Sequence, residues 1–281
     1  MRKIRLDERV VALGLAADLE TARRLIMAGE IRTGDRVWDK AGQKVAADQP
    51  LEHRPRGLPW VSRGGRKLAR ALAVFAVPVA GAVCLDIGAS TGGFTDVLLQ
   101  AGAAAVTALD VGYGLLDARL RADPRVTVRE RTNFRTLPVD AFPQPFDLVV
   151  TDVSFISLRL IVPHAFAFLR PAGAVIALIK PQFEAPPDQV EPGGLVRDPA
   201  VHRSVIEHLQ DAFAGEGICL HGLEPAPIVD EHKNVEYLSL WRRGDPPAAV
   251  DIGAIVGAAT ARPPRAGPLS ERAASRRPPR A

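Results

Sequence analysis

The stretch VCLDIGASTGGFTDVLLQAG, Val83 to Gly102, contains a strand pattern, a glycine-rich turn and a helix pattern in direct succession. Its apolar start, Val83 to Ile87, predicts a buried strand, and Gly93 to Gln100 predicts the helix. Glycines let the backbone adopt positive φ and approach a ligand closely, and the N-terminus of a helix offers free N–H groups. The stretch therefore predicts a ligand-binding loop at the carboxyl end of a strand.

Further strand and helix patterns alternate with this unit up to about residue 244. The other runs that predict strands are Ala105 to Asp110, Val126 to Val128, Phe146 to Thr151, Ala174 to Ile179, Ile218 to Gly222 and Val235 to Trp241. Helical patterns cover Leu158 to Leu169 and Val201 to Ala214. This alternation is typical of an α/β protein whose mostly parallel sheet is covered on both faces and binds ligands at the carboxyl ends of its strands.

The glycine loop fits a nucleoside cofactor without phosphates better than a nucleotide. A dinucleotide fingerprint starting at Gly88 would need a second glycine where Ser90 stands, and a P-loop would end in Gly-Lys-Ser/Thr instead of Gly-Gly-Phe. Asp86 could bind an ammonium group directly or through the loop, and Asp110 could accept hydrogen bonds from two ribose hydroxyls. These features favour S-adenosylmethionine, although a strand-end carboxylate such as Asp110 often only caps a turn.

The first 57 residues predict a separate α+β module. Two short amphipathic helices, the second ending at Gly29, precede EIRTGDRVW (30–38), which predicts two strands around a turn. DKAGQKV (39–45) predicts another turn and strand. The prolines and glycine of EHRPRGLPW mark a linker, which we place at residues 58–62.

Charge is distributed unevenly along the chain. Residues 1–70 contain 16 basic and 9 acidic residues, whereas residues 71–244 contain 14 basic and 20 acidic residues. A basic head on an acidic body suits a polyanion such as RNA, and it equally suits a solvated surface. The cations that we expect to contact RNA are Arg5, Arg23, Arg24, Lys40, Lys44, Arg63 and Arg66.

Composition indicates an ordinary globular protein, since 47% of the 281 residues are hydrophobic and 24% are charged. The α/β domain is expected to cover residues 63–244, and residues 245–281, rich in Pro, Ala and Arg, are expected to form a disordered basic tail. No signal peptide or spanning segment is evident, so we expect a cytoplasmic protein. Cys84 and Cys219 lie in apolar runs, which favours reduced thiols over a disulfide or metal site.

Seven motifs identify a family resemblance. They are SRGGRKLARAL (Ser62 to Leu72), LDIGASTGGFTD (Leu85 to Asp96), LDVGYGLL, ERTNFR, TDVSFISL, LIKPQFE and GGLVRDPAVH. Together and in this order they resemble the TlyA family, a branch of the FtsJ-like RNA 2′-O-methyltransferases with an RNA-binding module of the ribosomal-protein S-four type in front. The likeness runs from about Arg5 to Trp241.

The resemblance implies a Rossmann-like, seven-stranded sheet with one antiparallel strand near its end and S-adenosylmethionine as methyl donor. Asn133 and Phe134 would flank the adenine of the cofactor. The full set of expected cofactor-binding residues is Asp86, Gly88, Ser90, Gly92, Gly93, Phe94, Asp110, Asn133, Phe134 and Asp152.

The resemblance also implies a catalytic Lys-Asp-Lys-Glu tetrad. It matches Lys67 in GGRKL, Asp152 in VVTDVSF, Lys180 in LIKPQFE and Glu236 in NVEYL. Two positions depart from the family pattern. Lys233 stands where a glycine usually precedes the asparagine of this last motif, and DLETARR stands where a Ser-Arg pair usually precedes the second helix.

Methyl transfer to a ribose hydroxyl requires an aligned oxygen that loses its proton. A free lysine, with a pKa of about 10.4, is too basic to accept this proton at neutral pH. Burial and a second ammonium group both lower the pKa of a lysine, and Lys67 and Lys180 could have this effect on each other while Asp152 and Glu236 fix their positions. Lys180 could then act as the base, or it could stay charged and stabilise the alkoxide. Glu184 is either structural or in contact with substrate, and His202 is expected to help start a helix.

We therefore expect an S-adenosylmethionine-dependent methyltransferase that modifies a ribose 2′-hydroxyl, that of a cytidine, in ribosomal RNA or ribosomal subunits, without a DNA or membrane partner. Two alternatives stand beside this expectation. Relatives have been called haemolysins, which would mean a membrane-active protein. A ribosome-binding or assembly factor could also keep the fold without catalysis.

Overall fold

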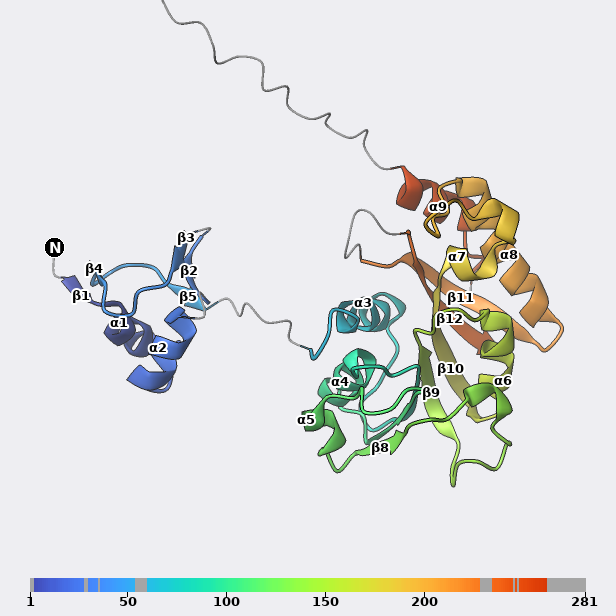
Figure 1. Cartoon of the computed structure of the whole chain (residues 1–281), viewed down its shortest axis with the longest axis horizontal. Coiled ribbons are helices and arrows are strands. Elements are labelled where there is room, and N and C mark those ends of the chain that lie inside the picture. Colours follow the sequence, from blue (N-terminus) through green and yellow to red (C-terminus); the bar gives the residue numbers. More distant parts are fainter. Residues whose placement is uncertain are drawn as a thin grey trace, which may run out of the picture. The chain divides into compact units, whose positions relative to one another are not determined.

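The chain divides into two compact units, Met1–Gly65 and Arg66–Ala281 (Figure 1). The computed structural model describes residues 3–27, 30–34, 36–53, 60–227, 234–244, 246 and 248–261, apart from the side chains of residues 24 and 27. The division lies just beyond the predicted linker, 58–62, which falls partly outside the described residues.

Short strands and two helices build the first unit. They are β1 (Lys3–Arg5), α1 (Leu6–Ala12), α2 (Leu19–Met27), β2 (Ile31–Thr33), β3 (Arg36–Trp38), β4 (Lys44–Ala46) and β5 (Glu52–His53). The helices and the strands β2, β3 and β4 lie where the sequence predicts them. The sequence did not reveal β1, which pairs with β4, or β5, which pairs with β2, because strands this short have no periodicity of their own.

One apolar cluster holds this first unit together. Its buried members are Leu6, Val10, Ala22, Ile26, Ile31, Trp38 and Val45. They come from both helices and from β2, β3 and β4, so each element contributes an apolar face to the same small core.

The second unit is larger and alternates strands with helices. Its elements are α3 (Gly65–Phe75), β6 (Val83–Ile87), α4 (Gly93–Gln100), β7 (Ala105–Leu109), α5 (Ala118–Arg121), β8 (Val126–Arg129), η1 (Phe134–Thr136), β9 (Phe146–Thr151), η2 (Leu158–Leu160), α6 (Val162–Phe166), β10 (Leu169–Ile179), α7 (Pro181–Glu184), η3 (Pro187–Gln189), α8 (Pro199–Ala214), β11 (Ile218–Pro225), β12 (Tyr237–Arg243) and α9 (Ile252–Thr260), where η marks a 3-10 turn.

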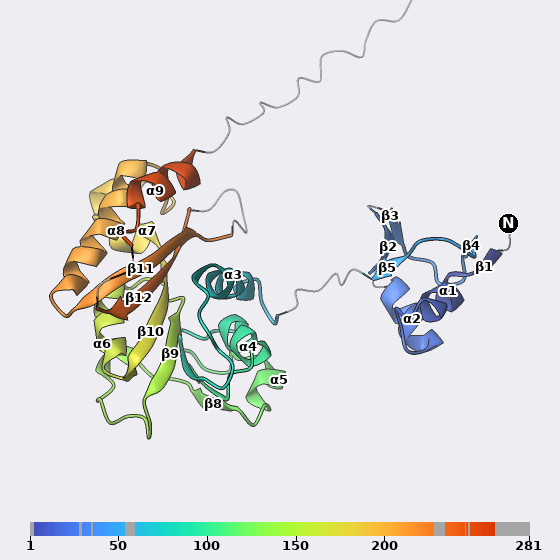
Figure 2. The same ribbon diagram turned by 180° about the vertical axis from the view of Figure 1, so that it is seen from behind.

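The seven strands β6 to β12 form one sheet in the order β11-β12-β10-β9-β6-β7-β8. Only β12 runs antiparallel to its neighbours, which confirms the predicted α/β class and its single reversed strand. Helices α3, α4 and α5 lie on one side of the sheet, and α6, α8 and α9 lie on the other (Figures 1 and 2). The apolar strands are therefore covered on both faces, as their nearly continuous hydrophobic runs predict.

Some element boundaries differ from the prediction. The expected helix Leu158 to Leu169 is instead η2 followed by α6, and Leu169 already belongs to β10, where it pairs with Phe146 of β9. Strand β11 continues past Gly222 to Pro225 through a bulge. Short apolar runs suit a buried helix and a buried strand alike, so periodicity alone did not locate these ends.

The predicted disordered tail, residues 245–281, is wrong for residues 252–260, which form α9. Ile252 and Val256 of this helix are buried, and Asp251 caps it by accepting a hydrogen bond from the Ala254 N–H at 2.9 Å. The buried residues form a narrow apolar stripe on one face of the helix. The composition averaged over the whole tail does not reveal this stripe. Residues 262–281 lie outside the described residues.

Two contacts fix α3, the helix that carries Lys67, against β11. A side chain at Gly222 would come within 2.7 Å of a ring carbon of Phe75, so this ring packs on bare backbone at the bulge. Arg70 on the same helix donates a hydrogen bond from Nε to Glu224 Oε1 at 3.1 Å. The position of α3 therefore depends on a glycine in a neighbouring strand.

We expect Gly222→Ala to lower the free energy of unfolding by about 1–3 kcal/mol, because the added methyl group displaces Phe75. Denaturant unfolding of the full chain measures this change. Gly215→Ala is the matched control, since a side chain there meets nothing within 4 Å, and its stability should be unchanged or slightly raised. Equal losses in both variants would contradict the packing of α3 on β11.

Candidate active site

Four charged side chains from distant segments meet at one edge of the sheet. Lys67 Nζ lies 2.6 Å from Glu236 Oε2 and 3.4 Å from Asp152 Oδ2. Lys180 Nζ lies 2.6 Å from Asp152 Oδ1. The structure thus brings together all four members of the expected tetrad, with Asp152 between the two lysines.

Sheet topology explains this meeting. Strands β9 and β10 are parallel neighbours, so Asp152 and Lys180, which follow them directly, emerge at the same edge. Strand β12 runs antiparallel to β10, and its first residue, Tyr237, pairs with Ile179, the last residue of β10. Glu236 therefore stands beside Lys180 because β12 is reversed.

Lys180 ends an apolar strand and is nevertheless well partnered. Only 8% of it is exposed, and its ammonium group donates a hydrogen bond to Ser154 Oγ at 2.9 Å in addition to the ion pair with Asp152. Pro181 follows at the start of α7, where its missing N–H is tolerated and the strand ends. Sequence analysis did not identify Ser154, although it lies within the TDVSF motif.

The environment of Lys67 differs from the sequence-based expectation. Burial, the strongest single influence, lowers the pKa of Lys67, but the charges of Asp152 and Glu236 and their hydrogen bonds outweigh it, so the net pKa is raised. The idea that the two ammonium groups lower each other's pKa is therefore wrong for Lys67. Paired with two carboxylates, it acts as a fixed cation.

The glycine loop between β6 and α4 closes against the tetrad. Gly88 and Gly92 have φ of 78° and 95°, in the left-handed region that favours glycine. A side chain at Gly88 would lie 3.1 Å from the Val153 side chain, next to Asp152. Because no Cβ fills that space, the loop and the segment after β9 approach closely.

Asp110 and Asp86 both stabilise this loop, in different ways. Asp110 Oδ2 accepts a hydrogen bond from the Ser90 N–H at 2.8 Å, and its Oδ1 accepts one from the Gly112 N–H at 2.7 Å. Asp86 is 1% exposed and accepts a hydrogen bond from Thr95 Oγ1 at 2.7 Å. Of the two expectations for Asp86, the structure favours an action through the loop over direct contact with a ligand.

The remaining predicted cofactor residues divide into loop and core positions. Phe134 is 3% exposed, and its ring packs against His164 and Phe168, with centroids 5.0 Å and 5.6 Å away. The ring therefore belongs to the core, and the expectation that Asn133 and Phe134 flank the adenine stays a prediction. Asn133 caps η1 by accepting a hydrogen bond from the Arg135 N–H. Gly93 and Phe94 are buried in the first turn of α4.

These residues fit a nucleoside cofactor with a charged tail. Gly88 and Gly92 hold the loop after β6 in a left-handed backbone, and Asp110 offers carboxylate oxygens at the end of the next strand. The loop presents backbone N–H groups without the lysine that a phosphate-binding loop requires. S-adenosylmethionine, with ribose hydroxyls and no phosphate, suits this set of groups.

Phe155, three residues after Asp152, is a further residue near the tetrad that was not predicted from the sequence. It is 90% exposed, and its backbone is held at φ 62°, which is unusual for a bulky residue. Its ring centroid lies 4.8 Å from that of Phe183, and the Lys180 ammonium group lies 5.9 Å from the Phe183 centroid. A large apolar surface thus stands in solvent beside the tetrad.

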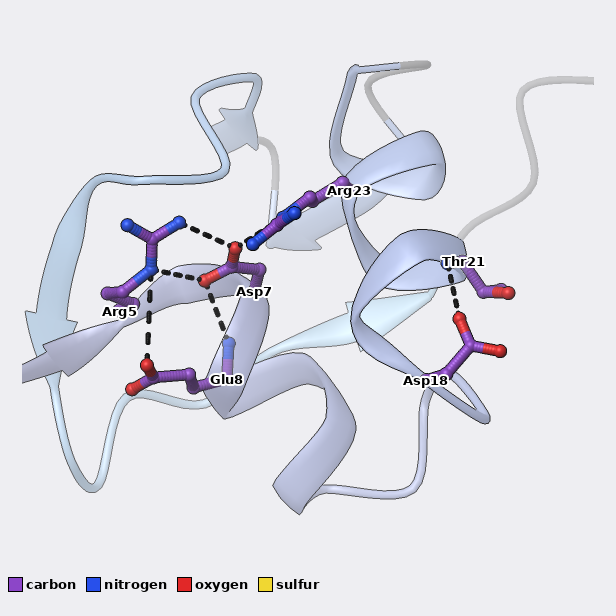
Figure 3. Close-up of polar contacts among 6 residues, drawn as sticks. All are labelled: Arg5, Asp7, Glu8, Asp18, Thr21 and Arg23. Carbon is purple, nitrogen blue, oxygen red and sulfur yellow. Dashed lines mark hydrogen bonds and ion pairs between the residues drawn. The ribbon is translucent and has the colours of Figure 1, made fainter.

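In the first unit, a buried carboxylate joins two of the predicted RNA-binding residues (Figure 3). Asp7 is fully buried and accepts hydrogen bonds from Arg5 Nη2 at 2.8 Å and from Arg23 Nε at 3.0 Å. The hydrogen bonds from Arg5 are the main reason why the pKa of Asp7 falls to about 2. The other predicted RNA-binding residues, Lys40, Lys44, Arg63 and Arg66, are exposed, and the Arg24 side chain lies outside the described part.

Comparison with known proteins adds independent findings. Residues 60–243 match the FtsJ-like methyltransferase family. The chain is 44% identical over 253 residues to the 16S/23S rRNA (cytidine-2′-O)-methyltransferase TlyA of Mycobacterium tuberculosis, covering 86% of this chain and 90% of that protein. It is 46% identical over 238 residues to YqxC of Bacillus subtilis, a candidate rRNA methyltransferase, covering 84% and 85% of the two chains.

A solved structure shows that the likeness spans both units. A candidate hemolysin from Streptococcus thermophilus is 40% identical, with a TM-score of 0.68, and the match covers 92% of this chain and 96% of that one.

The pH dependence of stability tests the environment of Asp86. Burial raises its pKa from 3.8 to about 7, so its contribution to stability is present below about pH 4 and is lost as the pH rises through 7. We expect Asp86→Asn to remove this loss, which amounts to about 2–4 kcal/mol. Denaturant unfolding at pH 5 and pH 7.5 measures it, with Asp188→Asn, at an exposed position, as control. Parallel pH profiles for Asp86→Asn and the unmodified protein would contradict the assignment.

Proposed function

This chain belongs to the TlyA family of FtsJ-like methyltransferases, and we propose that it transfers a methyl group from S-adenosylmethionine to the ribose 2′-hydroxyl of a cytidine in ribosomal RNA. The observation that carries the proposal is the contact of Lys67, Asp152, Lys180 and Glu236 beside the glycine loop. This arrangement can hold a hydroxyl oxygen next to a cofactor and stabilise the negative charge that the oxygen gains during the reaction.

The cofactor supplies an electrophilic methyl group when it is bound. The chain's own residues must hold the cofactor, align the attacking oxygen and stabilise its charge. The loop from Gly88 to Gly92 and the carboxylate of Asp110 would hold the nucleoside part. Asp86 joins the end of β6 to the first turn of α4 through Thr95, and so fixes the two elements that flank the loop.

Lys180 is the group that we assign to the attacking oxygen. Its ammonium group stands at the carboxyl edge between Asp152 and Ser154, so it places positive charge where the 2′-oxygen becomes negative. Lys67, with its raised pKa, stays charged and binds both Asp152, the partner of Lys180, and Glu236. We therefore favour alkoxide stabilisation over general-base catalysis for Lys180.

An exposed aromatic surface supports a nucleotide substrate. Proteins that recognise RNA sequence-specifically stack unpaired bases on aromatic side chains. Phe155 offers such a surface beside Lys180. A small hydroxyl substrate would not need it.

The first unit supports docking on RNA phosphates. Lys3, Arg5 and Lys44 are exposed on one face of the β1–β4 ribbon, whereas Val45 on the other face is buried in the core. Arg5 and Lys44 are direct partners across the two strands, so two cations lie side by side on this face, although Arg5 is also paired with Asp7. Neighbouring cations can contact RNA phosphates, which makes the ribbon a suitable RNA contact.

We infer that the protein works in the cytoplasm on ribosomal subunits, because rRNA in that form is the proposed substrate. Both Cys84 and Cys219 are free thiols. Within the described residues, no helix has the length and hydrophobicity needed to cross a membrane.

Transfer of tritium from labelled S-adenosylmethionine to unmodified ribosomal subunits tests the function. We expect label on ribose with the full chain, and a loss of at least about 100-fold in Lys180→Ala, the scale on which removal of one electrostatic stabiliser acts. Cofactor affinity should hardly change in this variant. Absence of ribose label with the unmodified enzyme would overturn the proposal, and lysis of liposomes by both proteins would favour a membrane-active function.

Salt dependence of RNA binding tests the docking surface. Exchange of Arg5 and Lys44 for glutamine should weaken RNA binding and reduce the slope of log affinity against log salt by about one for each lost phosphate contact. Arg203→Gln is the control, since Arg203 is an exposed cation with a carboxylate partner, as Arg5 is, but lies on α8 in the other unit. An unchanged slope in the double variant would place the RNA elsewhere.

A further inference from the structure

The motif GGLVRDPAVH, residues 193–202, contributes no residue to the tetrad or to the glycine loop. It forms a loop followed by the start of α8, and Asp198 caps this helix by accepting a hydrogen bond from the Ala200 N–H at 2.8 Å. The helix start therefore does not require His202, which is 1% exposed and faces the core. A buried histidine needs partners for both ring nitrogens, so its two contacts indicate what the motif does.

Both ring nitrogens of His202 have a partner. Nε2 lies 2.8 Å from the Val196 carbonyl oxygen, and Nδ1 lies 2.8 Å from the Tyr237 hydroxyl oxygen. A carbonyl oxygen can only accept, so Nε2 carries a proton and donates it. Burial, the strongest influence, lowers the pKa of His202, although the hydrogen bond to Val196 and the charge of Asp198 oppose this effect. In the neutral ring that burial favours, Nδ1 accepts a hydrogen bond from the Tyr237 hydroxyl group.

Val196 is the common anchor of two residues that flank Glu236. Its N–H donates a hydrogen bond to Asn234 Oδ1 at 2.8 Å, so Asn234 binds it directly. Tyr237 binds the carbonyl side of the same residue through His202. The short segment from Asn234 to Tyr237 is therefore held at both ends by one point of the loop.

Glu236 of the tetrad lies between these two anchors. Its backbone carbonyl oxygen accepts a hydrogen bond from the Ala226 N–H at 2.8 Å, and its Oε2 lies 2.6 Å from Lys67 Nζ. Lys67 also binds Asp152, which is the partner of Lys180. A shift of Glu236 would therefore reach the lysine that we assign to the attacking oxygen.

The contact between His202 and Tyr237 is shielded from water. The two residues are 1% and 0% exposed, and their rings meet edge to face with centroids 5.7 Å apart. A hydrogen bond is stronger where water does not compete, and loss of either partner leaves the other polar group buried without one. The segment that carries Glu236 therefore has little freedom while His202 is in place.

We propose that His202 is a positioning residue for the methyl transfer, which acts with Tyr237 to hold the Glu236 carboxylate against Lys67. The proposal rests on the proposed function, since it assigns a further residue to the same site. It explains why the motif ends in an imidazole, which combines a donor and an acceptor in one rigid ring. Because His202 is buried, its influence on the reaction passes through Glu236.

A double-mutant cycle with Glu236 tests this role. His202→Phe keeps a ring but loses both hydrogen bonds, and it should lower kcat on ribosomal subunits by about 10- to 100-fold, the scale on which a small misplacement acts. In a Glu236→Gln background the same exchange should cause little further loss, because both changes remove the same contribution. KM for the subunits and cofactor affinity should stay the same. Losses that add in the double variant, or an unchanged kcat in His202→Phe, would overturn the proposal.

Two milder variants separate positioning from damage to the core. Tyr237→Phe loses only the hydroxyl group, so it should lower kcat and add little to the loss in His202→Phe. His202→Gln can still donate to the Val196 carbonyl oxygen and accept from Tyr237, so it should keep most of the activity. His208→Phe, the same exchange at an exposed position of α8, is the matched control and should leave kcat unchanged. Equal losses in His202→Gln and His202→Phe would contradict a role through hydrogen bonds.

Nitrogen NMR of the labelled full chain keeps the proposal separate from the proposed function. The His202 ring should be neutral with its proton on Nε2, and its Nδ1 signal should shift in Tyr237→Phe, because this atom loses its donor. If the unmodified enzyme labels no ribose, the proposed function fails. An unchanged Nδ1 signal in Tyr237→Phe refutes the anchor itself.

Discussion

Charge neutralisation at one partly buried edge is the constraint on which the active site depends. Two ammonium groups and two carboxylates share this edge, and each would be costly there without the others. Asp152 stands between Lys67 and Lys180, and Glu236 completes the set through its ion pair with Lys67. Loss of any one group leaves a charge without its partner, so the four residues stabilise the site and its chemistry as a unit.

The scaffold serves this arrangement through strand direction. Parallel strands alone would deliver residues from their carboxyl ends, and a residue that precedes a strand would lie at the opposite edge. The reversal of β12 changes this, because its start pairs with the end of β10 and brings Glu236 beside Lys180. Helix α3 carries Lys67, and its position depends on the packing of Phe75 against the backbone at Gly222. A single reversed strand and one glycine thus complete a site that four distant segments build.

How much the sequence could reveal follows from the physics of each feature. Strands β6 and β9 and helix α4 match their predicted ends, because long apolar runs and a glycine turn define them locally. The tetrad could be named only through the family resemblance, since a lysine at a strand end has no local signal of catalysis. The burial of the Phe134 ring was not predicted, because an apolar ring after a strand suits a core as well as a cofactor pocket. Helix α9 was missed because the composition of a long tail conceals two buried residues.

The same physical device occurs in both units. In the first, buried Asp7 holds Arg5 and Arg23 in place while parts of both side chains remain exposed. In the second, Glu184 holds the loop from which Phe155 projects. In each case a buried or partly buried carboxylate fixes the group that faces solvent, because a hydrogen bond is stronger where less water competes. Rigid presentation of cations and of an aromatic ring lowers the entropy lost when a ligand binds. A protein that must recognise one nucleotide within a large folded RNA gains selectivity from such preorganised surfaces. The fixed groups do not move to contact a substrate that is wrongly placed.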